Sequence, residues 1–188
     1  TKRADWMESA SELILDGMSY YQVVFTLPNQ LSRLALGNRK EIYDLLFRAS
    51  WSALQTQIRQ EQGYDPAALM VLHTWNQKLE AHAHVHAVVP GAGPGVGDNG
   101  WCVSKRGDDL SSTGYYLVNA DELRGLFREH FLHQLSVNML LFQHDSSEQR
   151  ERVIKSVRQH RIGWRSYRPT RFRAIDPTRQ VEAGRRIL

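Results

Sequence analysis

The stretch Leu79-Glu-Ala-His-Ala-His-Val-His-Ala-Val-Val89 alternates histidine with small apolar residues and ends at Pro90. In a β-strand, residues two apart point to the same face, about 6.6–6.8 Å from one another along the chain. His82, His84 and His86 therefore share one face, and the apolar residues between them share the other. The stretch predicts a strand with imidazoles on one side and a protein core on the other.

The segments on either side of this strand predict an α+β fold. The pairs Asn38/Glu41 and Asn119/Glu122 have capping-box spacing, so a helix is expected to begin at each. The central strands lie close together in sequence, which favours a central antiparallel sheet with flanking helices over a doubly wound sheet. We expect strands at 20–27, 68–75, 101–105 and 115–118, helices at 5–17, 39–62, 119–132 and 147–161, and a flexible glycine-rich loop at 91–100.

The composition narrows the classes of protein to which the chain can belong. The 188 residues include one cysteine and no run of 18 apolar residues. A disulfide framework, a cysteine-rich zinc module and a membrane span are therefore not expected. The sequence also begins without an initiator Met or an apolar signal segment, so we expect a cytoplasmic protein and a piece of a longer chain.

Charge divides the chain into two parts. Residues 1–147 carry 12 Lys or Arg against 16 Asp or Glu, and residues 148–188 carry 12 against 4. We therefore expect a metal-binding α+β core at 1–147 and a basic helix and tail at 148–188. Arginines interleaved with aromatic residues are typical of nucleic-acid contact surfaces, although a solvated helix face has a similar composition. The residues expected to contact DNA are Arg158, Arg161, Trp164, Arg165, Tyr167, Arg168, Arg171 and Arg173.

The histidine strand is the candidate metal site. A pair such as His84 and His86 on a rigid strand supplies two nitrogen ligands, and a neighbouring element must supply a third. A lone histidine is more often structural, but three alternating histidines in an apolar strand favour a metal. The leading candidate for the third ligand is His73 on the preceding strand, and the alternatives are His82, Glu80 and Gln77.

Several motifs, taken in order, carry a family resemblance. They are Tyr20-Tyr-Gln-Val-Val-Phe-Thr-Leu-Pro28, Tyr43-Asp-Leu-Leu-Phe47, Leu72-His-Thr-Trp75, and His82-Ala-His-Val-His86 with Val89-Pro-Gly-Ala-Gly93 behind it. Together they resemble the bacterial two-tyrosine HUH transposases, which are rolling-circle insertion-sequence enzymes. HUH denotes His, a hydrophobic residue and His, which here is His84-Val85-His86.

The resemblance implies an HUH endonuclease-like sheet on which two histidines and a third polar residue hold Mg²⁺ or Mn²⁺. It also implies that the substrate is single-stranded DNA at transposon ends, including hairpins, in a nucleoid-associated bacterial protein. The metal would polarise the scissile phosphate while a tyrosine attacks it and forms a 5′-phosphotyrosine link. Because imidazole suits Mn²⁺ better than Mg²⁺, we expect greater activity with Mn²⁺.

The resemblance leaves the nucleophile unassigned. The family's catalytic tyrosines lie on a helix of which Val181–Leu188 resembles only the start, so we expect the nucleophile beyond Leu188, with Tyr167 as the remaining candidate. The family's usual cysteine-rich zinc module is also missing from this sequence. Two alternatives stay open: a catalytically silent module that binds single-stranded or hairpin DNA, and a metal-dependent hydrolase. The hydrolase is disfavoured because Glu80 is the one nearby carboxylate that could act as a base.

Overall fold

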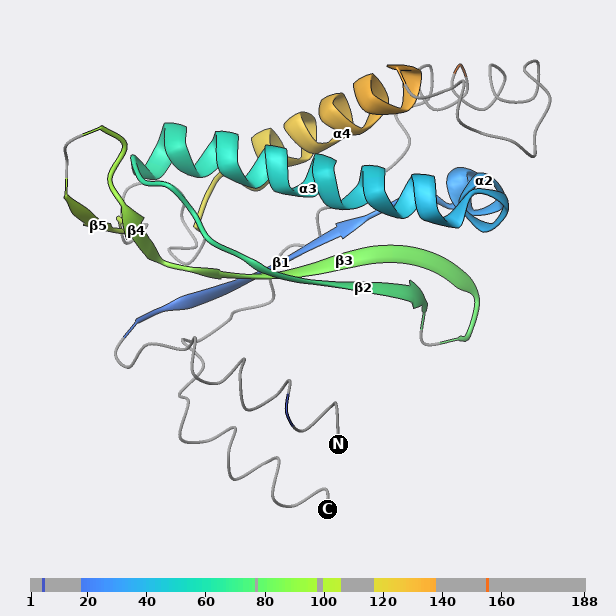
Figure 1. Cartoon of the computed structure of the whole chain (residues 1–188), viewed down its shortest axis with the longest axis horizontal. Coiled ribbons are helices and arrows are strands. Elements are labelled where there is room, and N and C mark those ends of the chain that lie inside the picture. Colours follow the sequence, from blue (N-terminus) through green and yellow to red (C-terminus); the bar gives the residue numbers. More distant parts are fainter. Residues whose placement is uncertain are drawn as a thin grey trace.

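The computed structural model describes residues 5, 18–76, 78–97, 100–105, 117–137 and 155. The helices predicted at 5–17 and 147–161, and the boundary predicted at residue 147, lie outside these ranges apart from single residues. The described elements, in chain order, are β1 (Tyr20–Thr26), η1 (Asn29–Leu31), α2 (Ser32–Gly37), α3 (Arg39–Gln62), β2 (Leu69–Trp75), β3 (Ala81–Pro90), β4 (Ala92–Pro94), β5 (Trp101–Val103) and α4 (Ala120–Val137) (Figure 1).

The main sheet has three strands in the order β1-β3-β2, and both outer strands run antiparallel to β3. The predicted antiparallel α+β fold is therefore confirmed. Opposite residues in such a ladder share a face. Val24 of β1 pairs with His86, and His73 of β2 pairs with His84. The register thus places the histidines of two strands on one face of the sheet.

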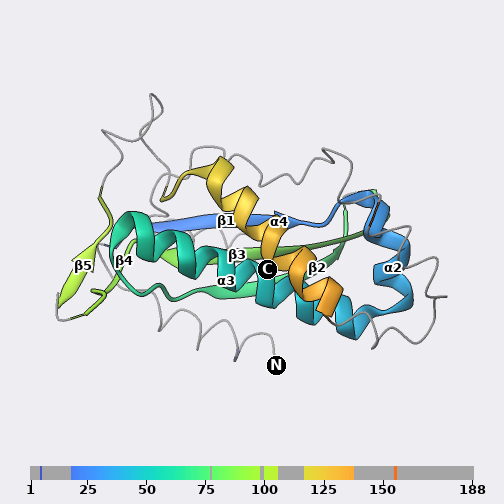
Figure 2. The same ribbon diagram turned by 90° about the horizontal axis from the view of Figure 1, so that it is seen from above.

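Helices α3 and α4 cover the opposite face of the sheet (Figures 1 and 2). The alternation in β3 explains why, because Val85, Ala87 and Val89 are fully buried in the core beneath the helices. The rings of Phe25 in β1 and Phe127 in α4 lie 5.0 Å apart. Burial of this face anchors β3, so the histidines on its other side stand on a rigid element.

Helix α3 has the predicted bounds, but its start lacks the predicted side-chain cap. Gly63 adopts a left-handed conformation (φ 76°), and its N–H donates to the carbonyls of Ile58 and Arg59, which ends the helix. At the start, however, the Asn38 side chain makes no capping hydrogen bond and instead donates through Nδ2 to the Leu34 carbonyl, at 3.2 Å. The predicted capping box at Asn38 is wrong because the unpredicted helix α2 directly precedes Asn38 and offers that carbonyl.

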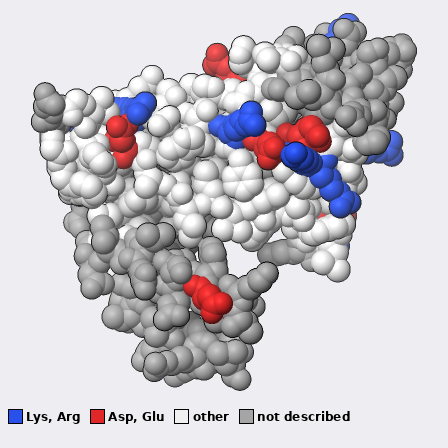
Figure 3. Space-filling model, in the orientation of Figure 1, with Lys and Arg blue, Asp and Glu red and all other residues white. Residues whose placement is uncertain are grey.

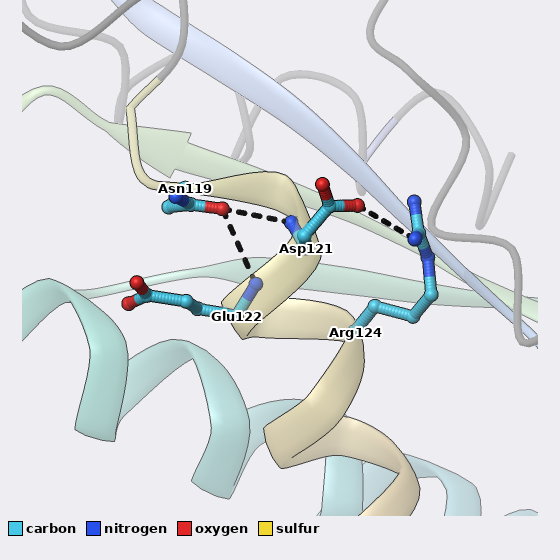
Figure 4. Close-up of polar contacts among 4 residues, drawn as sticks. All are labelled: Asn119, Asp121, Glu122 and Arg124. Carbon is cyan, nitrogen blue, oxygen red and sulfur yellow. Dashed lines mark hydrogen bonds and ion pairs between the residues drawn. The ribbon is translucent and has the colours of Figure 1, made fainter.

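Helix α4 begins with the predicted cap, shown in Figure 4. The Asn119 side-chain oxygen accepts from the N–H of Asp121 at 2.9 Å and of Glu122 at 3.3 Å. Glu122 does not complete the box, since its carboxylate accepts instead from Gln57 of α3 at 2.8 Å. The Glu61 carboxylate of α3 accepts from the Asn119 N–H, at 3.0 Å. The end of α3 therefore supplies the second half of the cap and fixes the two helices to each other.

The described part of the glycine-rich stretch, residues 91–97 and 100, forms regular structure where its composition predicts a flexible loop. Its first part forms β4, which pairs with β5, and the Asp65 N–H donates to the Pro94 carbonyl at 2.7 Å. A Cβ on Gly93 would collide with the Asp65 backbone and the Tyr64 ring. The glycine there permits close packing of two chain segments. The strand predicted at 115–118 is not seen at Leu117 and Val118, and residues 115 and 116 lie outside the described ranges.

Charges of both signs are interspersed on the face of the described chain seen in Figure 3, mainly over the helical layer. Arg59 of α3 pairs with Asp65, and Arg124 pairs with Asp121 in the first turn of α4. Among the helices of the described ranges, none is both long enough and apolar enough to cross a bilayer.

Candidate metal centre

Three histidines converge on the face of the sheet that points away from α3 and α4. His84 and His86 come from the central strand β3, and His73 comes from β2 directly opposite His84. One nitrogen from each ring can be chosen so that all three lie within 4.8 Å of one another. The centroid of the His73 ring is 5.2 Å from that of His84 and 4.4 Å from that of His86. The structure thus brings together the three residues that the sequence favoured.

The donor set of this triad suits a divalent cation. Imidazole nitrogen is a common ligand for first-row divalent metals, at about 2.0–2.1 Å from the ion. Three neutral rings add no negative charge, so an ion held there keeps its full double positive charge for an anionic ligand. Two rings protrude from β3 and the third from its hydrogen-bonded neighbour β2. The pairing of these strands in the sheet therefore sets the spacing of the three rings.

A backbone hydrogen bond fixes the orientation of His84. Its Nδ1 lies 2.8 Å from the His82 carbonyl oxygen. A carbonyl oxygen can only accept, so Nδ1 carries the proton and donates it. The lone pair of Nε2 is then free to bind a cation, as in metal-binding histidines whose other ring nitrogen donates to the protein.

His86 has a side-chain partner instead. The amide Nε2 of Gln22 in β1 lies 2.6 Å from His86 Nδ1. Gln22 and His86 are 64 residues apart in sequence, and the pairing of β1 with β3 brings them together. In the sequence, Gln22 is distinguished only as a polar residue in the mainly apolar strand 20–27.

The position of the triad in the sheet keeps two of its rings neutral near pH 7. Burial lowers the pKa of His84 below its usual 6.5, and the nearby His73 and His82 lower this pKa further, while the hydrogen bond to the His82 carbonyl raises it. Burial also lowers the pKa of His86, with contributions from His73 and His84. Because β3 is the central strand, neighbouring strands flank both rings. Neutral imidazole is the form that binds metals.

The alternatives for the third position lie apart from the triad or outside the described ranges. The register shifts between His73 and Trp75, so that Trp75 pairs with Ala81 and His82 has no direct partner on β2. The ring of His82 lies 5.5 Å from that of His84, but His82 does not belong to the three-residue group. The Glu80 carboxylate accepts from Asn76 Nδ2 at 2.7 Å in the β2–β3 turn. Gln77 lies outside the described residues.

Exposed apolar side chains continue the face of the triad along β2. Leu69 and Val71 are each 38% exposed and Trp75 is 53% exposed. All three are an even number of residues from His73 and so point to the same face of β2, whereas the residues of β2 on the opposite face are less exposed. An exposed Trp two residues from a candidate ligand offers a flat surface for stacking. The spacing of two residues between His73 and Trp75 is the feature of the sequence that predicts a shared face for these side chains.

The described tyrosines do not supply a nucleophile next to the triad. Tyr20 pairs with Pro90, four residues from His86 along β3 and so about 13 Å away. Tyr21 and Tyr43 pack against the core. The Tyr64 hydroxyl donates to the Pro90 carbonyl at 3.1 Å, and burial raises the pKa of this fully buried side chain well above its usual value.

The predicted DNA contacts lie outside the described residues and stay predictions. This applies to Tyr167 as a candidate nucleophile and to Trp164. It also applies to the arginines Arg158, Arg161, Arg165, Arg168, Arg171 and Arg173.

A family model described as "Putative transposase" (Y2_Tnp) matches residues 67–172, which include all three triad histidines. The chain belongs to this family. A relative from Sinorhizobium fredii (strain NBRC 101917 / NGR234), named "Putative transposase y4qJ", is 36% identical over 135 residues. The match covers 71% of this chain and 32% of that relative, so the chain spans about a third of its length. The resemblance to the Y2 transposases that the motifs indicated is therefore confirmed.

The solved structures to which this transposase-family chain is similar include complexes of the conjugative relaxase TrwC. A metal-free complex of TrwC with OriT DNA has a TM-score of 0.49 and 17% identity, and the match covers 75% of this chain and 56% of that one. TrwC with a 27-mer DNA comprising the recognition hairpin and the cleavage site has a TM-score of 0.43 and 12% identity, and the match covers 88% and 73%.

Proposed function

We propose that this chain is the metal-binding core of a DNA-nicking transposase that acts on single-stranded DNA through a 5′-phosphotyrosine link. The observation that carries the proposal is the triad of His73, His84 and His86, whose ligand atoms lie within 4.8 Å of one another. Membership of the transposase family supports the same reading. The proposed cation is Mg²⁺ or Mn²⁺, with Mn²⁺ the better match to three imidazoles.

The residues of the triad would hold and orient the phosphate site. A divalent cation bound by the three rings would supply a Lewis acid and a template for the scissile phosphate. The rigid strand pair β2–β3 fixes the direction of the ligands, and the rings of His84 and His86 are half-buried. Trp75 would stack on a base next to that phosphate, since base–aromatic stacking stabilises single-stranded complexes by about 1–3 kcal/mol per base.

The nucleophile in this proposal is a tyrosine outside the described residues. The described tyrosines are either buried in the core or far along the sheet from His86. A helix beyond Leu188 is the proposed source, and Tyr167 is the candidate within the chain. The lack of a tyrosine beside the triad among the described residues also supports a second proposal. In it, this chain binds single-stranded or hairpin DNA and another subunit cuts the DNA.

Gel electrophoresis with labelled single-stranded oligonucleotides from the ends of the protein's own element would test the proposal. With Mn²⁺, we expect a retained complex on a native gel that the His84→Ala variant loses. On a denaturing gel, a protease-sensitive slow band would mean that the nucleophile lies within these 188 residues, and Tyr167→Phe would then remove the band. Mn²⁺-independent binding that His84→Ala leaves intact would contradict a metal-centred function.

A further inference from the structure

The contact between Gln22 and His86 points to a residue that acts on the triad from a third strand. Gln22 lies in β1 on the same face as Val24, the register partner of His86, and its amide reaches diagonally to His86 Nδ1 at 2.6 Å. We propose that Gln22 is a positioning residue that selects the tautomer of His86 and so decides whether Nε2 of His86 can bind a divalent cation. This inference rests on the proposed metal-binding function.

A neutral imidazole allows two hydrogen bonds between the Gln22 amide and Nδ1 of His86, which differ in the direction of donation. When the Gln22 amide N–H donates to Nδ1, the ring proton must sit on Nε2, and neither nitrogen has a lone pair free for a metal. When the amide turns by half a turn, its Oε1 accepts from Nδ1–H, and the lone pair of Nε2 becomes free. In the protein, Nε2 of Gln22 faces the ring of His86, which corresponds to the first arrangement.

His84 provides the contrast within the same site. Its Nδ1 faces the His82 carbonyl, which can accept but cannot donate. His84 is therefore held in the tautomer with a free Nε2, whether or not a metal is present. The triad thus contains one ring fixed by the backbone and one ring whose tautomer depends on the orientation of an amide.

This difference predicts that two substitutions at Gln22 affect the His86 tautomer and the metal affinity differently. A carboxylate can only accept, so Gln22→Glu should hold His86 permanently in the tautomer with a free Nε2. A methionine neither donates to nor holds the ring, so Gln22→Met should leave the ring without a polar partner on β1. A metal-bound His86 whose Nδ1–H lacks an acceptor should bind the cation about 10–100-fold more weakly than one whose Nδ1–H faces a carboxylate.

The first measurement is Mn²⁺ affinity by titration calorimetry at pH 8, on the full chain and its variants. We expect Gln22→Met to bind Mn²⁺ about 10–100-fold more weakly than Gln22→Glu does, and Gln22→Glu to bind at least as tightly as the wild type. Gln30→Met is the matched control, because Gln30 is exposed and lies in η1, outside the sheet that carries the triad, and it should bind as the wild type does. Equal Mn²⁺ affinities in Gln22→Met and Gln22→Glu, with unchanged thermal transitions, would overturn the proposal.

The second measurement separates this proposal from the metal function on which it rests. The ¹⁵N chemical shifts of the His86 ring in the metal-free protein report which nitrogen carries the proton. We expect the proton mainly on Nε2 in the wild type and on Nδ1 in Gln22→Glu. An identical ring tautomer in the wild type, Gln22→Glu and Gln22→Met would overturn the role of Gln22 even if Mn²⁺ binds. Conversely, absence of Mn²⁺ binding to the wild type would refute the metal function while these shifts still decide the role of Gln22.

Discussion

The two faces of β3 are built from alternate residues of one strand but serve different ends. Val85, Ala87 and Val89 are completely buried under the helices, whereas His84 and His86 are half-buried on the other side. One face provides packing free energy, and the other provides three convergent nitrogen ligands with His73. A well-packed face of a strand can therefore hold in place the backbone from which the ligands of its other face project.

The largest expected effect is on the free energy of unfolding, when asparagine is substituted at one position on each face of β3. Val85→Asn removes a buried side chain and buries an unpaired amide, so we expect a loss of about 3–5 kcal/mol in the free energy of unfolding. His84→Asn changes a half-exposed position and should cost less than about 1 kcal/mol. Urea unfolding followed by circular dichroism measures both. Equal losses in the two variants would remove the distinction between the faces.

Metal binding, unlike stability, should be most sensitive to substitutions on the histidine face. We expect His84→Ala and His86→Ala each to lower Mn²⁺ affinity by at least about 100-fold, or about 2.8 kcal/mol, while the fold survives. His82→Ala is the matched control from the same strand and face, because His82 lies outside the triad. Calorimetry measures the affinity. If either single triad variant binds one Mn²⁺ as tightly as the wild type, the triad is not the metal site.

DNA binding tests how far the functional face extends along β2. Trp75→Ala should weaken binding of a single-stranded oligonucleotide by about 1–3 kcal/mol, the typical contribution of one stacked base. Trp101 on β5 is also exposed, at 61%, but belongs to the separate two-stranded sheet, so Trp101→Ala is the control. Fluorescence anisotropy in the presence of Mn²⁺ measures the affinity. A larger loss from Trp101→Ala would place the DNA on another surface.

The smallest effect concerns acid stability of the metal-free protein. Because the pKa of His84 and of His86 is lowered in the folded state, the unfolded chain binds more protons below about pH 6.5. Stability should therefore fall as the pH falls through and below 6.5, and this loss should be smaller in the double variant His84→Gln/His86→Gln. His133→Gln, at an exposed position on α4, is the control. Thermal unfolding from pH 8 to 5 measures the loss, and parallel curves for wild type and double variant would contradict it.

The histidine face was predictable because it depends on local alternation alone. Period-two spacing places His84 and His86 together, and a hairpin of short separation brings His73 beside them. The same spacing could not exclude His82, because the excluding feature is the register shift near Trp75, which depends on how two strands pair. Gln22 could not be assigned either, since its contact requires the order β1-β3 across 64 residues.

The two helix starts show why an identical motif can have different outcomes. Asn38 and Asn119 are each followed three residues later by Glu, yet only Asn119 caps its helix. At Asn38 the preceding helix α2 supplies a competing carbonyl. At Asn119 the carboxylate of Glu61, from a distant part of the sequence, accepts from the backbone N–H in place of the expected Glu122. The local sequence pattern indicates where a helix begins, and tertiary neighbours decide which groups accept hydrogen bonds from the N–H groups at that start.

The short sequence separation of the triad has a consequence for the order of folding. His73 and His86 lie 13 residues apart on one β-hairpin, so their contact closes a short loop at small entropic cost. The Gln22–His86 contact must wait for β1 to join across 64 residues. During refolding, a divalent cation should therefore meet its three ligands on the β2–β3 hairpin before β1 is added. Arrival of β1 would then complete the site by bringing the amide against an imidazole already in place.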